Sequence, residues 1–126
     1  MEIRKNRPVF LNLLRIRMPI MAIQSIMHRI FGVLMVLMLP WVIYLFDLSL
    51  MNPQGFDQVN EFLASPFVRI LMAIPVWMLA HHIFAGIRYL LLDVEWGICR
   101  DNARKSAWLV NAAGLLVPVI YLGVIL

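Results

Sequence analysis

The chain has 126 residues, of which 63% are hydrophobic and 14% are charged, and its formal net charge is +4. Soluble domains carry about 25% charged residues, so this composition excludes an ordinary soluble domain and indicates one membrane domain over residues 1–126. The basic residues flank apolar segments instead of forming a continuous basic face, which argues against a nucleic-acid partner.

The chain begins with a basic leader, which contains Arg4, Lys5, Arg7, Arg15 and Arg17. The apolar run after this leader is long and lacks an Ala-x-Ala-like cleavage site. This is not the pattern of a cleavable signal peptide.

Three apolar segments are long enough to cross a bilayer, at residues 26–46, 67–92 and 106–126. A hydrocarbon core of about 30 Å requires about 20 helical residues. Each segment contains an interior proline, which membrane helices tolerate because neighbouring groups satisfy the freed carbonyl. The sequence therefore predicts an all-α integral membrane fold with three transmembrane helices.

The distribution of lysine and arginine predicts the orientation of these helices. The leader has five such residues, residues 47–66 have none, and residues 93–105 have three. The positive-inside rule then places the N-terminus and the 93–105 connection in the cytoplasm and the C-terminus outside. Asn, Pro and Gly within residues 51–57 predict a turn in the outer connection.

The second half of the second span holds three ionisable side chains, His81, His82 and Arg88, and Asp93 follows directly after the span. Such groups cost roughly 2.5–3.5 kcal/mol each in a membrane and normally face protein or a cofactor. At 100° per residue, Gly86 and Tyr89 share one helical face with His82 and Asp93. Counting back from Asp93 places His82 about 16 Å deep, close to the bilayer midplane.

Spacing alone leaves three interpretations of His82 open. A neutral imidazole with Gly86 one turn along can ligate a haem iron beside a flat macrocycle. The same ring can instead hydrogen-bond a neighbouring helix, or relay protons with Arg88 and Asp93. His81 points along a different line and is the weaker candidate ligand, and the single Cys99 offers neither an internal disulfide nor metal-ligand spacing.

A second polar group lies at the start of the first span, where Ser25, His28, Arg29 and Gly32 share one helical face. A hydroxyl, an imidazole and a guanidinium suit a carboxylate or a quinone oxygen. The alternative is an interfacial anchor with a snorkelling arginine and a capping serine. The rise per residue places His28 about 13 Å from His82 along the membrane normal, so a second axial histidine for one iron would come from another chain.

The chain resembles the large cytochrome b membrane-anchor subunit of succinate dehydrogenase, respiratory complex II. Three motifs carry the resemblance: Arg7-Pro8 before the first span, Ser25-x-x-His28-Arg29, and His82-x-x-x-Gly86-Ile87-Arg88 followed by Asp93. With the spans and their order, the resemblance extends over nearly the whole chain. Phe31 replaces the usual serine or threonine, and Tyr89 replaces a histidine that is often found there.

The resemblance implies that His82 is one axial ligand of haem b and that a smaller anchor subunit supplies the other and completes the helical bundle. His28 and Arg29 would lie near the haem propionates, and Ser25 and Arg29 would line a ubiquinone or menaquinone site at the cytoplasmic face. Arg88 and Asp93 would have a structural role or lie on a proton path.

The resemblance also implies a bacterial inner-membrane complex that passes electrons from succinate to quinone. FAD and the iron–sulfur clusters would belong to separate flavoprotein and iron–sulfur subunits. Three alternatives remain: an anchor of a quinol:fumarate reductase, a homodimeric cytochrome b with two copies of His82 on one haem, and a small proton-coupled transporter.

Overall fold

The computed structural model describes residues 17–125, which form five helices and no strand. In chain order the helices are α1 (Ile20–Met51), α2 (Pro53–Ala64), α3 (Pro66–Leu71), α4 (Ala73–Asp93) and α5 (Arg100–Ile125). Three stretches are long and apolar enough to cross a membrane, namely Ile20–Met51, Pro66–Asp93 and Arg100–Ile125. The predicted all-α membrane fold is therefore confirmed. The leader residues Arg4, Lys5, Arg7, Pro8 and Arg15 lie outside the described residues.

The connection after α1 is the main difference from the sequence prediction. The expected turn over residues 51–57 is confined to Asn52, the one residue between α1 and α2, and residues 53–57 form the start of a helix that was not predicted. The Asn52 side chain accepts a hydrogen bond from the backbone N–H of Gly55 at 2.7 Å, and Pro53 occupies the first helical position. An asparagine cap followed by proline is a helix-start signal, which the turn prediction overlooked.

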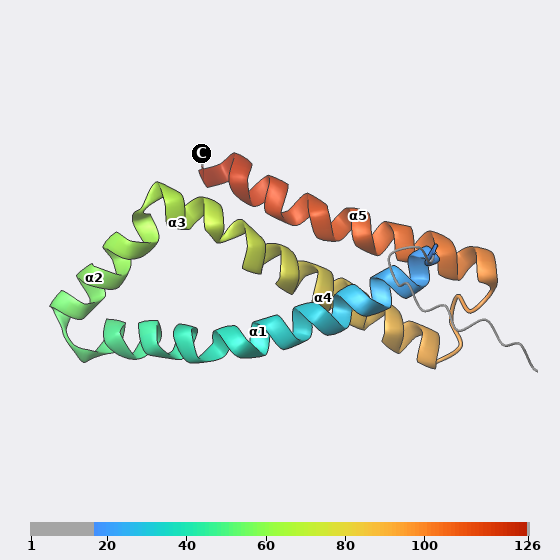
Figure 1. Ribbon diagram of the computed structural model, residues 1–126, viewed down its shortest axis with the longest axis horizontal. Helices are drawn as coiled ribbons and strands as arrows, with labels where there is room; N and C mark the ends of the chain where they lie inside the picture. Colours follow the sequence, from blue (N-terminus) through green and yellow to red (C-terminus); the bar gives the residue numbers. More distant parts are fainter. Residues whose placement is uncertain (1–16, 126) are drawn as a thin grey trace, which may run out of the picture.

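Gly55 allows α2 to fold back against the end of α1. A Cβ atom at this position would clash with the backbone carbonyl of Leu48. The connection therefore reverses direction within one residue, and α2 runs obliquely from the end of α1 towards α3 (Figure 1).

The second membrane segment is interrupted near its start by Pro75. Proline has no N–H to donate to the carbonyl of Leu71, and its ring crowds that carbonyl. Accordingly α3 ends at Leu71 and α4 begins at Ala73. Pro40 and Pro118 lie inside α1 and α5 without ending either helix.

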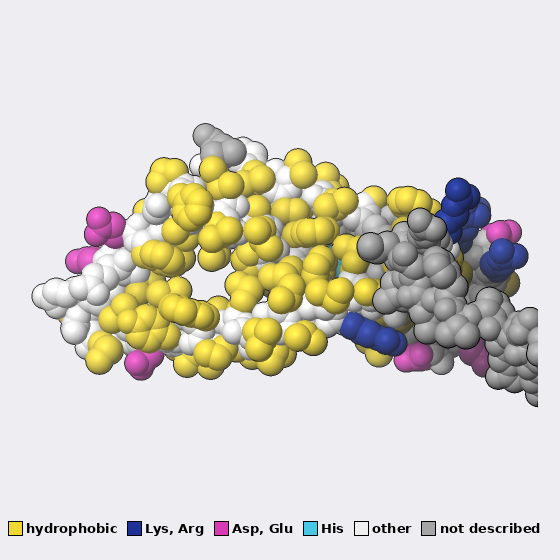
Figure 2. Space-filling model, viewed as in Figure 1, with side chains coloured by type: hydrophobic (Ala, Val, Ile, Leu, Met, Phe, Trp, Pro, Cys, Tyr) yellow, Lys and Arg dark blue, Asp and Glu magenta, His cyan; other side chains and the backbone are white. Residues whose placement is uncertain are grey.

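The three long helices pack unequally. α5 runs alongside α4, whereas α1 approaches α4 only in its first half and then diverges towards α2 (Figure 1). Hydrophobic side chains cover most of the face in Figure 2, and an opening is visible between α1 and α4 beside α2. A cavity of about 400 Å³ between these helices is lined by apolar side chains that include Met38, Val59 and Pro75. Contact between α1 and α4 is thus concentrated at the end where α1 begins.

Small residues bring α4 and α5 close together. Ala85 and Ala107 are completely buried, and a Cβ atom at Gly114 would lie 3.2 Å from the Cβ of His81. Small residues at helix interfaces let membrane helices approach and gain packing energy. This close approach fixes the position of the polar side chains on α4.

Gly114→Leu should lower the thermal unfolding temperature of the purified protein assembly, because the larger side chain forces α5 away from His81. Overpacking of this kind typically costs about 1–3 kcal/mol. Gly123→Leu is the matched control, since a Cβ at Gly123 meets nothing within 4 Å. Equal unfolding temperatures for the two variants in the same detergent would contradict the close packing at Gly114.

Candidate functional site

His82 projects from α4 towards α1 and forms a hydrogen bond that defines its tautomer. Its Nδ1 lies 3.2 Å from the backbone carbonyl oxygen of His28. A carbonyl oxygen only accepts, so Nδ1 must carry the proton, and in the neutral imidazole Nε2 then carries the free lone pair. An imidazole held in this way has the arrangement of a metal ligand oriented by a backbone carbonyl.

His28 lies directly against His82. The two rings are stacked with centroids 4.0 Å apart and planes 10° apart, and Tyr89 meets His28 edge-on at 5.3 Å. The expected separation of about 13 Å along the membrane normal is therefore wrong. Because α1 begins at Ile20 instead of residue 26, His28 lies about 12 Å along its helix, close to the level of His82.

The glycine that makes room for the His82 ring is Gly32. A Cβ atom there would lie 3.0 Å from Cε1 of His82, closer than ordinary contact. Gly86 lies against His28 instead, with its Cβ position 3.8 Å from His28 Nε2. Gly86, which the sequence suggested leaves space for a macrocycle, therefore lies at the interface beside His28, and Gly32 of α1 makes room for the His82 ring.

His82 opens onto a surface groove of about 480 Å³. The groove is lined by α1 residues between His28 and Leu37, including the exposed Arg29, and by His82 of α4. Three predicted site residues therefore meet in one groove. Ser25 is half-buried one turn before Arg29 and does not line it.

His81, although adjacent in sequence, has a closed environment. Its side chain is completely buried, and Nε2 lies 2.9 Å from Oδ1 of Asn111 on α5. Phe31 packs edge-on against both His81 and Trp77, with ring centroids 5.2 and 5.0 Å apart. The departure at Phe31 thus fills the interface between helices, and His81 links α4 to α5.

Arg88 is also a buried contact between helices. Its side chain is 6% exposed, with Nε donating to Ser106 Oγ at 2.9 Å, Nη1 to Gln24 Oε1 at 2.7 Å and Nη2 to the Ala103 carbonyl at 2.8 Å. These bonds join α4 to α1 and α5, while Asp93 is exposed at the end of α4. Sequence reasoning missed both side-chain partners of Arg88. A signal for one of them was Gln24, a glutamine in an apolar stretch.

Comparison with known proteins identifies the family of this chain. A sequence model of the succinate dehydrogenase/fumarate reductase transmembrane subunit family matches residues 3–121. The chain is 30% identical to the succinate dehydrogenase cytochrome b556 subunit of Coxiella burnetii over 90% of this chain and 92% of that protein. It is 29% identical to the protein of the same name from Paracoccus denitrificans over 94% of this chain and 92% of that protein.

The family match extends from the leader to the last turns of α5, so it includes every residue of the groove and of the Arg88 cluster. The chain covers 92% of the length of each of these two relatives. The chain belongs to the succinate dehydrogenase/fumarate reductase transmembrane subunit family.

Proposed function

We propose that this chain is the cytochrome b membrane anchor of a succinate:quinone oxidoreductase and that His82 is an axial ligand of its haem b. The tautomer of His82 is the observation that carries the proposal. Its Nδ1–H is engaged by the His28 carbonyl, which leaves the lone pair of Nε2 for iron. Two relatives that are named cytochrome b556 subunits support the assignment.

The residues around His82 fit a flat, amphiphilic macrocycle. The groove is mostly apolar along Val33, Val36 and Leu37, and the Arg29 guanidinium provides a positive charge for propionate carboxylates. His28 adds a second nitrogen donor or acceptor next to Arg29. Haem b would supply one-electron redox chemistry at this position.

The open side of the groove is the place for the second anchor subunit. The described residues form only one wall beside His82, and α1 carries exposed apolar side chains along Val33, Val36 and Leu37. A partner helix with its own histidine would supply the second axial ligand and cover these side chains. The resulting bundle would bury the haem between two chains.

Ser25 and Arg29 are proposed to bind the quinone, either ubiquinone or menaquinone. They lie one turn apart on α1, near the end where α1 begins and α4 joins α5. Quinone oxygens become negatively charged during reduction, and a hydroxyl and a guanidinium already in place would stabilise that charge.

Charge placement supports a cytoplasmic position for this end of the molecule. Arg100, Arg104 and Lys105 are at the start of α5, whereas Asp47, Asp57 and Glu61 are near α2 at the opposite end. By the positive-inside rule the basic end faces the cytoplasm. The proposed location of the complex is the inner membrane of a bacterium. The flavoprotein with FAD and the iron–sulfur subunit would dock there, close to the quinone.

Purification through a tag on this chain tests the proposed function. The expected product contains a flavoprotein, an iron–sulfur protein and a second anchor, shows a haem b spectrum and reduces quinone with succinate. Faster fumarate reduction by quinol would favour the second candidate, a fumarate reductase anchor, which the family description includes. Recovery of this chain with haem but without other subunits would favour a homodimeric cytochrome, and recovery without haem would contradict the proposal.

In that complex, Ser25→Ala and Arg29→Leu should depress quinone reductase activity while electron transfer from succinate to a soluble artificial acceptor survives. A neutral hydrogen bond contributes about 0.5–1.5 kcal/mol, and a charge-assisted one about twice that, so the arginine variant should be slower. Rates are measured over a range of quinone concentrations and normalised to acceptor activity and haem content. Unchanged normalised rates in both variants would place the quinone elsewhere.

A further inference from the structure

The Arg88 guanidinium is a buried cation whose partners are all uncharged. Its bonds go to an amide oxygen of Gln24, a hydroxyl of Ser106 and a backbone carbonyl of Ala103. A guanidinium has five N–H groups, so these three bonds leave one N–H on each terminal nitrogen. Burying a charge is costly unless an opposite charge compensates it.

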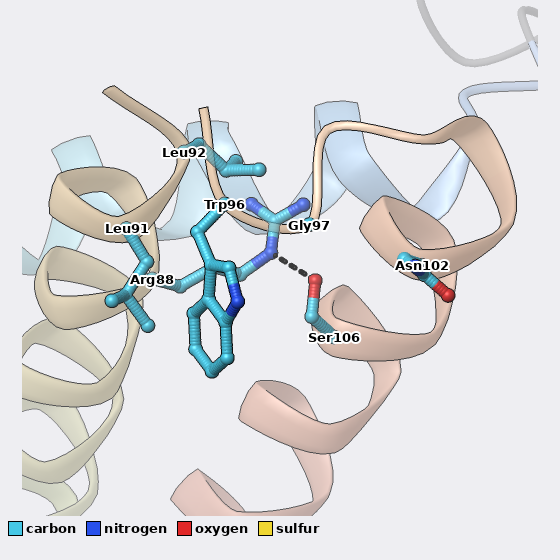
Figure 3. A pocket seen from close by; sticks show the side chains of 7 residues that line it. All are labelled: Arg88, Leu91, Leu92, Trp96, Gly97, Asn102 and Ser106. Atoms are coloured by element: carbon cyan, nitrogen blue, oxygen red, sulfur yellow. Dashed lines mark hydrogen bonds between the residues drawn. The ribbon is translucent and has the colours of Figure 1, made fainter. Parts of the chain in front are cut away.

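Arg88 also forms a wall of a cavity of about 490 Å³ between the end of α4 and the start of α5. The cavity is far larger than the volume that one molecule occupies in liquid water, about 30 Å³. Figure 3 shows the guanidinium between Trp96 of the connecting turn and Ser106 of α5, with Asn102 one turn earlier on the same helix. None of the described residues that line the cavity is acidic.

The lining combines two chemistries. Arg88, Asn102 and Ser106 provide polar groups, while Leu91 and the indole of Trp96 provide apolar surface. This lining suits an amphiphile with an anionic headgroup. The guanidinium can bind a phosphate through paired charge-assisted hydrogen bonds, and the apolar surface can contact the rest of the molecule.

The surroundings favour a lipid over a protein side chain. Trp96 lines the cavity, and Val94, Trp96 and Ile98 of the connecting turn are 72%, 69% and 57% exposed. Tryptophan is enriched at the headgroup level of membranes. The three basic residues of the 93–105 segment are matched in number by Asp93, Glu95 and Asp101, so the attraction for an anionic headgroup comes from Arg88 itself. We propose that this cavity binds the phosphate headgroup of an anionic phospholipid, with Arg88 as the counter-ion.

The proposal concerns a site separate from the His82 groove and does not depend on haem or quinone. Substituting Arg88 would also break its bonds to α1 and α5, so Asn102→Glu is the better probe. The new carboxylate would repel phosphate from the cavity. Asn60→Glu is the matched control, because Asn60 is exposed on α2, away from the cavity.

The experiment uses the complete purified assembly, stripped of loosely bound lipid, and measures retained lipid by native mass spectrometry. Phosphatidylglycerol, phosphatidylcholine and inorganic phosphate are compared as additives, with thermal unfolding as a second measurement. The wild type and Asn60→Glu should retain phosphatidylglycerol and be stabilised by it, whereas Asn102→Glu should bind it at least about tenfold more weakly.

Equal retention of phosphatidylglycerol and phosphatidylcholine would overturn the proposal, as would equal retention by the two glutamate variants. Stabilisation by inorganic phosphate that matches phosphatidylglycerol would show a site for a free anion instead of a lipid. A cross-link between this cavity and a carboxylate of another subunit would also overturn it, since the buried cation would then have a protein partner.

Discussion

Replacing His82 by alanine is expected to abolish the low-spin haem spectrum of the assembled complex, whereas His81→Ala should leave the spectrum nearly unchanged. The two residues are adjacent in sequence, but their environments differ. His82 lines an open groove with its Nε2 lone pair free of the His28 carbonyl bond, while His81 is completely buried and bonded to Asn111. Only His82 can present a nitrogen to an iron outside the helix pair.

The measurement is a reduced-minus-oxidised absorption spectrum and the electron paramagnetic resonance signal, both normalised to the amount of anchor subunit. His81→Ala removes a buried ring, and large-to-small substitutions of this kind cost about 2–5 kcal/mol. Its spectrum is therefore recorded well below its unfolding temperature. A normal bis-imidazole spectrum from the His82 variant would contradict the ligand assignment. Loss of that spectrum in the His81 variant alone would assign the ligand to His81 instead.

The predictable parts of the fold follow from the requirements of the lipid bilayer that surrounds the helices. A bilayer requires runs of about 20 apolar helical residues, and the lengths of such runs can be read directly from the sequence. The ends of the helices are less constrained, because water and headgroups satisfy backbone groups there. Consequently α1 starts earlier than expected at Ile20, and Pro53–Ala64 forms a helix where a turn was predicted.

The site was predictable where one helix defines it and unpredictable where two helices meet. The inward-facing character of His82 followed from its depth in one span, but the stacking of His28 on His82 depends on the relative level of α1 and α4. That level depends on how the two helices pack against each other, which the pattern of one helix does not show. In the same way, the bonds from Arg88 to Gln24 and Ser106 join residues 64 and 18 positions apart in sequence, and spacing within one helix gives no information about them.

The position of the other histidines leads to a prediction about assembly. Expressed alone, this chain should not hold a stable bis-histidine haem, and co-expression with a second anchor that has a histidine near the bilayer midplane should restore it. His28 stacks on His82 with centroids 4.0 Å apart, so it lies on the same side of the groove as the proposed ligand. His81 is buried between α4 and α5, and the chain contains only three histidines.

A haem held by two histidines would therefore take its second imidazole from another chain, because His28 is stacked on His82 and His81 is enclosed between α4 and α5. The test compares haem content and the low-spin spectrum of the membrane fraction with and without the second anchor, at equal amounts of this chain. His28→Ala in the co-expressed pair is the control, because it should retain a low-spin haem if His28 only supports His82. A monomeric chain that held a bis-histidine haem by itself, and lost it on His28→Ala, would show that His28 is the second ligand and that the groove closes without a partner.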